Sequence, residues 1–215
     1  MPEKNQDLHG MVPDAAPVAL LLVDVINAME FEGGQRLAEA ALPAARRLAE
    51  LRREARELGI PVIYANDNFG KWRSDFREVV DHALDDVPGR PIAELLEPDE
   101  DDYFVLKPKH SAFYATTLDV LLKYLGTRRL VVGGFSGDVC VLFTAGDAYM
   151  RDLQVHVPAD CVASVHEEEN RRALAYMRRV LEVRTAPSTA LDLGALLREG
   201  DGGDEDGEED EDAGE

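Results

Sequence analysis

Cys140 has the sequence surroundings of a nucleophile. It follows an apolar run, Leu130–Gly134, and a Gly/Ser-rich bend, and it precedes a stretch that predicts a helix from Val141 to Arg151. A helix N-terminus carries partial positive charge and unpaired N–H groups, which lower a thiol pKa and can hold an oxyanion. A cysteine in this position can attack a carbonyl carbon, although a small buried structural thiol is the common alternative.

Two more reactive side chains end apolar runs. Asp24 follows Val18–Val23, and Lys107 follows Tyr103–Leu106. In parallel sheets the carboxyl ends of the strands share one edge, so we expect Asp24, Lys107 and Cys140 to converge there. Asp24 would take the thiol proton and later activate water, Lys107 would stabilise the thiolate, and a thioester would form and be hydrolysed. The plainer alternatives are a loop cap for the carboxylate and a solvated strand end for the ammonium.

The elements that must position these residues alternate along the chain. Pro43 is expected to begin the first helix and Gly59 to end it, while Thr116 and Asp119 resemble a capping box for a later helix. This order predicts an α/β protein, a three-layer α/β/α sandwich with a mainly parallel central sheet. The expected strands are 18–23, 61–65, 103–106, 130–134, 154–157 and 183–185, and the expected helices are 43–58, 74–84, 116–125, 141–151 and 168–181.

Composition limits the classes of partner. The 215 residues suit one domain, at 17–199, with a polar lead-in at 1–16 and an acidic tail at 200–215 that we expect to be disordered. The net charge of −20 makes nucleic acid an unfavourable partner, because phosphate binding needs a basic face. No apolar run could span a bilayer, no secretory leader is visible, and two cysteines make no disulfide scaffold. We therefore expect a cytoplasmic protein.

Three segments together resemble the isochorismatase-like cysteine hydrolases. They are Ala19–Asn27 with its Asp24, Lys107–Leu118 with its Lys and Ser-Ala-Phe, and Gly134–Leu142 with its Cys140, in matching order over 17–186. The resemblance implies that family's Rossmann-like fold, an Asp-Lys-Cys triad and no cofactor. It also implies a cis peptide between Phe135 and Ser136, an oxyanion hole made by the backbone N–H groups of Ser136 and Cys140, and a homo-oligomer, either a dimer or a tetramer.

Departures from the family pattern bear on the substrate. Members that resemble nicotinamidases carry a histidine metal cluster after the second strand, whereas residues 66–72 here contain no histidine, so we expect no metal. Members that cleave the vinyl ether of isochorismate do not need the thiol, so Cys140 favours hydrolysis of a C–N bond in a small amide, ureido or carbamoyl compound. Phe135 replaces a small aliphatic residue, and Gly137 a usual Thr. A vinyl ether hydrolase and a non-catalytic binding module stay open as alternatives.

Several aromatic residues are candidates to shape the substrate pocket. Phe69, Trp72 and Phe113 lie near the expected edge, with core packing as the alternative for each. His110 either points at the site or is exposed to solvent. Cys161 is expected to be a buried structural thiol.

Overall fold

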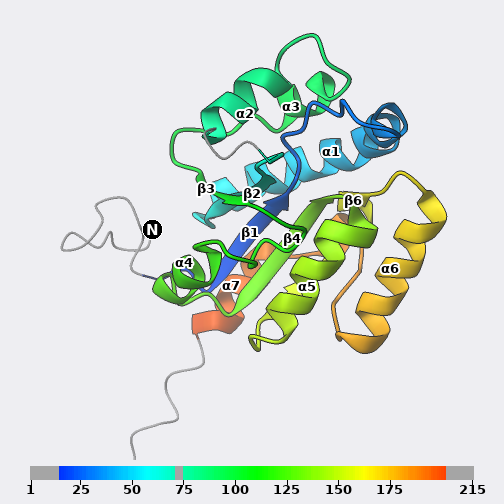
Figure 1. Ribbon diagram of the computed structural model, residues 1–215. Helices are drawn as coiled ribbons and strands as arrows, with labels where there is room; N and C mark the ends of the chain where they lie inside the picture. Colours follow the sequence, from blue (N-terminus) through cyan, green and yellow to red (C-terminus); the bar gives the residue numbers. More distant parts are fainter. Residues whose placement is uncertain (1–14, 71–74, 202–215) are drawn as a thin grey trace, which may run out of the picture.

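A six-stranded parallel sheet forms the centre of the molecule. The computed structural model describes residues 15–70 and 75–201, and within them the strand order is β3-β2-β1-β4-β5, with β6 paired to β4 (Figure 1). Strands β2 and β3 extend the sheet on one side of β1, whereas β4 and β5 extend it on the other side. The boundary between β1 and β4 is therefore a topological switch point. The strands are β1 (Val18–Val23), β2 (Val62–Asp67), β3 (Tyr103–Lys107), β4 (Arg129–Phe135), β5 (Gln154–His156) and β6 (Val162–Ala163).

Helices cover both faces of the sheet, which confirms the predicted three-layer α/β/α class (Figure 1). Helices α1, α2, α3 and α7 pack on one face, and α4, α5 and α6 pack on the other. The helices are α1 (Gly34–Glu57), α2 (Phe76–Ala83), α3 (Arg90–Leu95), α4 (Leu118–Tyr124), α5 (Leu142–Tyr149), α6 (Glu167–Val180) and α7 (Leu193–Asp201).

Strand β1 shows why the apolar runs became central strands. All six residues of Val18–Val23 are fully buried. Successive side chains point to opposite faces, so Leu20 and Leu22 join the core under α1 whereas Ala19 and Leu21 join the core under α4 and α5. A strand with apolar side chains on both faces fits only in the middle of a sheet that helices cover on both sides.

Helix α1 begins nine residues earlier than predicted. Pro43 was expected at its first turn, but the helix starts at Gly34 and carries Pro43 in its interior. The apolar stripe continues backward through Leu37 and Ala41, which are buried against the sheet, while Pro43 itself is exposed. Burial of the first turns therefore offsets the cost of an interior proline. The predicted end is confirmed, because Gly59 follows the helix at φ 72°.

Two smaller local predictions are wrong. The predicted capping box does not form at α4. Thr116 Oγ1 accepts the N–H of Leu118, the first residue of the helix, and donates to Ala112 O, while Asp119 pairs with Lys123 and Arg151. The expected strand at 183–185 is reduced to a single bridge between Arg184 and His156. Helices α3 and α7 and strand β6 were not predicted, and each is either short or weakly periodic.

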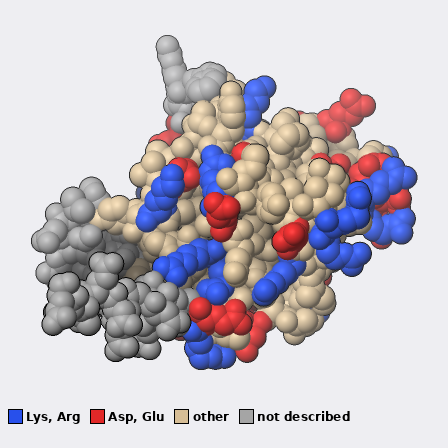
Figure 2. Space-filling model, turned by 90° about the horizontal axis from the view of Figure 1, so that it is seen from below, with Lys and Arg blue, Asp and Glu red and all other residues tan. Residues whose placement is uncertain are grey.

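Some predictions lie outside the described residues. These are Trp72, the lead-in up to residue 14, and the acidic tail from residue 202. In the part that the structure describes, no helix is both long and apolar enough to cross a bilayer. Seen from below, the surface carries Lys and Arg side chains next to Asp and Glu side chains rather than gathered by sign (Figure 2).

Candidate active site

Strand register brings the three reactive residues to one edge of the sheet. Val23 pairs with Ala65 on one side and with Gly134 on the other, so Asp24 follows at the centre of the sheet. Lys107 is the last residue of β3 and pairs with Asp67 at the end of β2. Cys140 follows β4 on the other side of β1. The Lys107 side chain extends past β2 to reach Asp24.

The triad side chains are in contact. Lys107 Nζ lies 2.8 Å from Asp24 Oδ2 and 3.7 Å from Cys140 Sγ. The charge of the Asp24 carboxylate also acts on the Cys140 thiol. Lys107 is fully buried and Asp24 is 5% exposed, so the charges of this pair act in a medium that screens them far less than water.

The Asp24 carboxylate is fixed at both oxygens. Its Oδ1 accepts the backbone N–H of Asp67 at 2.8 Å, and its Oδ2 faces Lys107. The backbone of Asp24 adopts φ 54°, a left-handed conformation that is uncommon for residues other than glycine and that clusters at functional sites. The geometry of the acid therefore depends on the end of β2 as well as on its own strand.

Burial and charge set the protonation states. Burial raises the pKa of Asp24 above its usual value, although Lys107 and the hydrogen bonds act in the opposite direction. For Lys107, burial acts to lower the pKa, but the attraction of Asp24, Cys140 and Asp67 outweighs it and the net shift is upward. Burial and the Asp24 charge together raise the pKa of the Cys140 thiol to about 12.

The expectation that the thiol pKa is lowered is wrong for the resting site. Lys107 does favour the thiolate, but desolvation and the adjacent Asp24 carboxylate outweigh it. Cys140 also does not start a regular α-helix. It lies inside a π-helical turn, Gly137–Val141, that precedes α5. At rest the arrangement is a neutral thiol beside a carboxylate that can accept its proton.

The loop before Cys140 has a tightly constrained backbone. Gly134 has φ 136°, and a Cβ there would overlap the carbonyl oxygen of Val23, so only glycine lets β4 approach β1 at this point. The peptide bond between Phe135 and Ser136 is cis. The Ser136 carbonyl then accepts N–H groups from Val139 and Val141 at 3.2 and 3.1 Å.

Two site residues were missed or underrated in the sequence. Asp67 Oδ2 lies 3.7 Å from Lys107 Nζ, so a second carboxylate faces the ammonium. His110 Nδ1 lies 3.9 Å from Cys140 Sγ, and its exposed ring packs against Phe143. The two alternatives for His110 are therefore both correct, because its side chain is exposed to solvent and also lies next to the thiol. The sequence did hold one indication of this, because His110 lies only three residues after Lys107.

The pocket candidates have different surroundings. Phe69 is 46% exposed, and its N–H donates to Asp67 Oδ1 at 2.6 Å. It lines a cavity of about 220 Å³ between the loop after β1 and helix α2. Phe113 is buried in the core under α4 and α5, with the Arg151 guanidinium 4.5 Å from its ring centroid. A role in substrate binding stays a prediction for both residues.

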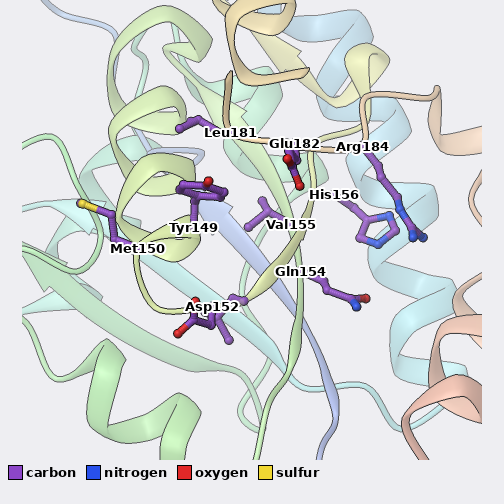
Figure 3. A pocket seen from close by; sticks show the side chains of 10 residues that line it. Tyr149, Met150, Asp152, Gln154, Val155, His156, Leu181, Glu182 and Arg184 are labelled. Atoms are coloured by element: carbon purple, nitrogen blue, oxygen red, sulfur yellow. The ribbon is translucent and has the colours of Figure 1, made fainter. Parts of the chain in front are cut away.

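A second hollow lies at the opposite end of the sheet. It measures about 530 Å³ and runs along β5 between the end of α5 and the segment after α6 (Figure 3). Tyr149, Gln154 and Glu182 are among its lining residues. Asp24, Lys107 and Cys140 are not among its lining residues, so this hollow is separate from the candidate active site.

The described residues contain no cluster of side chains that could bind a metal ion. Across residues 15–70 and 75–201, no three His, Cys, Asp or Glu side chains gather closely enough to hold a metal ion. The segment 66–72, for which the sequence predicts no metal cluster, extends outside this range at residues 71 and 72. The expectation that the protein uses no metal stays a prediction.

Comparisons with known proteins show the family of the chain. The family model described as the isochorismatase domain matches residues 18–188. An uncharacterized isochorismatase family protein, YaaI of Bacillus subtilis, is 41% identical over 166 residues, or 77% of this chain and 91% of the relative. The ureidoacrylate amidohydrolase RutB of Methylorubrum extorquens is 31% identical over 176 residues, or 68% of this chain and 70% of the relative.

A solved structure extends the similarity to three dimensions. The crystal structure of an isochorismatase family protein from Desulfovibrio vulgaris superposes with a TM-score of 0.68 at 26% identity, over 85% of this chain and 99% of that one. The matched residues include all six strands of the described sheet, helices α1 to α6 and the positions of Asp24, Lys107 and Cys140. This chain belongs to the isochorismatase family.

Proposed function

We propose that the protein is a cysteine hydrolase that cleaves a C–N bond in a small amide, ureido or carbamoyl compound through a thioester on Cys140. The observation that carries the proposal is the buried contact of Lys107 Nζ with Asp24 Oδ2 at 2.8 Å and with Cys140 Sγ at 3.7 Å. The similarity to an amidohydrolase in the same family supports the choice of a C–N bond.

The first half of the reaction forms the thioester. Asp24 accepts the thiol proton as Cys140 Sγ attacks the carbonyl carbon, and the carbonyl oxygen becomes an oxyanion. The backbone N–H groups of Ser136 and Cys140 would donate to this oxyanion; in other enzymes such a donor is worth roughly 3–4 kcal/mol. When the intermediate collapses, the C–N bond breaks and the departing nitrogen takes the proton from Asp24.

The second half regenerates the enzyme. Asp24, now ionised again, takes a proton from a water molecule whose oxygen attacks the thioester carbon. The same N–H groups hold the second oxyanion, and collapse expels the sulfur, which regains its proton from Asp24. The raised pKa of Asp24 suits this repeated exchange, because a stronger base accepts the proton of a thiol or a water more readily.

Lys107 acts through its charge and not as a proton donor. Its raised pKa keeps it cationic throughout, at 3.7 Å from the sulfur and 2.8 Å from the carboxylate. It stabilises the thiolate as that forms and keeps Asp24 ionised in a buried position. Removal of this cation would leave an unpaired buried carboxylate, which is strongly unfavourable.

The test combines a substrate panel with triad variants. The panel contains simple amides, ureido acids and carbamoyl amines, with isochorismate as the vinyl ether. For the compound that is turned over, we expect Cys140→Ala, Asp24→Asn and Lys107→Met each to lower kcat by about a thousandfold or more, because each group acts in the bond-making step.

Cys161→Ala is the matched control. Cys161 is the other cysteine, it is fully buried in the core, and it belongs to the structural segment after β5. This variant should keep its rate. Undiminished turnover of isochorismate by Cys140→Ala would instead make the thiol incidental and would contradict the proposal.

A further inference from the structure

The loop that carries Cys140 is held from one side by side chains outside the triad. The backbone N–H of Asp138 donates to Ser164 Oγ at 3.1 Å, and Ser164 Oγ donates to Asn170 Oδ1 at 3.1 Å. Asn170 Nδ2 in turn donates to the carbonyl oxygen of Val162 at 3.4 Å. Val162 lies in β6, which pairs with the end of β4 at Gly134, so this chain of hydrogen bonds links the loop to the sheet.

Gly137 and Asn170 fit each other sterically. A Cβ on Gly137 would overlap Asn170 Oδ1, and it would lie 3.2 Å from Asn170 Cγ and 3.5 Å from Ser164 Oγ. Gly137 does not adopt a positive φ, so its backbone conformation is open to any residue. Glycine is required at this position because the Asn170 amide, on the first turns of α6, occupies the place of a side chain.

We propose that Ser164 and Asn170 are positioning residues, which hold the Gly137–Asp138 backbone so that the neighbouring N–H groups of Ser136 and Cys140 aim at the developing oxyanion. Ser164 is 2% exposed, and its single proton is committed to Asn170, so its lone pairs are left for the Asp138 N–H. Displacement of a catalytic donor by a fraction of an ångström is enough to lower the rate. The catalytic part of this inference rests on the proposed function.

The kinetic test separates positioning from general stability. For Asn170→Ala and Ser164→Ala we expect kcat on the best amide substrate to fall about tenfold or more, as when an oxyanion donor is misaligned. KM should change by less than about threefold, because the oxyanion exists only in the transition state. The rate of Cys140 alkylation by iodoacetamide should not change, because displacement at a saturated carbon creates no oxyanion.

Arg171→Ala is the matched control on the same turn of α6. Arg171 is exposed and pairs with Glu168 on its own helix, so this variant should retain both rates. Alanine is a better helix former than asparagine, so a loss in Asn170→Ala cannot come from weaker helix propensity.

A rescue experiment tests the steric pairing directly. Gly137→Ala should lower kcat like Asn170→Ala, because the new methyl group displaces the loop. In the double variant Gly137→Ala/Asn170→Ala the methyl group enters the space that the amide leaves, so the two losses should not add and kcat should stay within about threefold of Asn170→Ala. Additive losses in the double variant would contradict the pairing.

Amide hydrogen exchange decides the inference independently of activity. In Ser164→Ala the Asp138 N–H loses the hydroxyl oxygen that accepts it. In Asn170→Ala the Ser164 hydroxyl stays but loses the Asn170 amide oxygen to which it donates. Exchange at Asp138 should therefore become about tenfold faster in Ser164→Ala, and faster in Asn170→Ala, than in the wild type and Arg171→Ala. Unchanged exchange, or unchanged kcat in both variants, would overturn the inference. If the wild type turns over no amide but exchange responds as expected, the proposed function fails while the role in holding the loop stands.

Discussion

At the residue scale, the Asp24 carboxylate has two opposite effects on the Cys140 thiol. In the proposed reaction it accepts the proton, yet its negative charge also raises the thiol pKa while the site is at rest. A site of this kind keeps its nucleophile neutral until a substrate carbonyl is in place. In the proposed mechanism the triad is therefore a proton-transfer pair with a fixed cation, which differs from a resting thiolate stabilised by a helix end.

These two effects predict that Asp24→Asn changes the rate of amide hydrolysis and the rate of Cys140 alkylation in opposite directions. Amide hydrolysis should be lost, whereas alkylation of Cys140 by iodoacetamide at pH 8 should become about tenfold faster, because removal of the carboxylate charge lowers the thiol pKa. In the wild type, alkylation should rise steadily from pH 7 to pH 10, since the thiol pKa of about 12 lies above that range. Time-resolved mass spectrometry measures both rates.

Lys107→Met serves as the opposite control. It removes the cation that favours the thiolate, so its alkylation should be slower than in the wild type. An Asp24→Asn variant that is alkylated more slowly than the wild type would mean that the carboxylate activates the resting thiol, which contradicts the roles assigned here.

At the scale of elements, helix α1 shows where burial outweighs local sequence preference. Pro43 lies exposed in its interior, beyond the first turn where proline is tolerated. The proline lacks the N–H that would bond to the carbonyl of the fourth preceding residue. The buried alanines and leucines on the other face keep the helix continuous across this point.

Pro43→Ala should therefore stabilise the protein. The substitution restores a helical hydrogen bond and removes no core contact, and we expect the free energy of unfolding to rise by about 1–2 kcal/mol after allowance for the more flexible unfolded chain. Urea denaturation measures the change. Arg46→Ala, an exposed position on the next turn, should stay within about 0.5 kcal/mol of the wild type. A loss of stability in Pro43→Ala would show that the proline sets the path of the helix.

The sequence predicted the elements whose signal is local and strong. Val18–Val23 and Leu130–Gly134 are apolar on both faces, so their place at the centre of a parallel sheet followed from composition alone. Strand ends then placed Asp24, Lys107 and Cys140 on one edge. The contribution of Asp67 was not predictable, because it depends on a backbone N–H that β2 aims at Asp24. The raised thiol pKa depends on burial, which no local pattern encodes.

At the scale of the whole molecule, helix α7 closes the described fold. Leu193 and Leu196 are buried with the residues of α1 and β1, so the chain contributes to the core almost to residue 201. The strongly acidic segment lies after this helix. Residues 202–215 carry nine acidic side chains and no basic one, so they contribute −9 to the net charge of −20.

Removal of residues 202–215 should leave the enzyme intact. We expect the free energy of unfolding to stay within about 0.5 kcal/mol and the hydrolytic rate to be retained, because α7 and both core clusters are kept. Leu196→Ala is the contrasting variant and should cost about 2–5 kcal/mol through the cavity that it leaves. Loss of activity in the truncated chain would assign the tail a catalytic or assembly role.

The covalent intermediate is the most direct test of the whole account. The purified protein is mixed with each compound of the amide and ureido panel, quenched in acid within seconds, and analysed by intact mass and peptide mapping. The account predicts a mass increase equal to the acyl part of the substrate, located on the peptide that contains Cys140 and absent from Cys140→Ala. Steady turnover by the wild type with an unmodified Cys140 peptide at every quench time, together with an equal rate in Cys140→Ala, would contradict it.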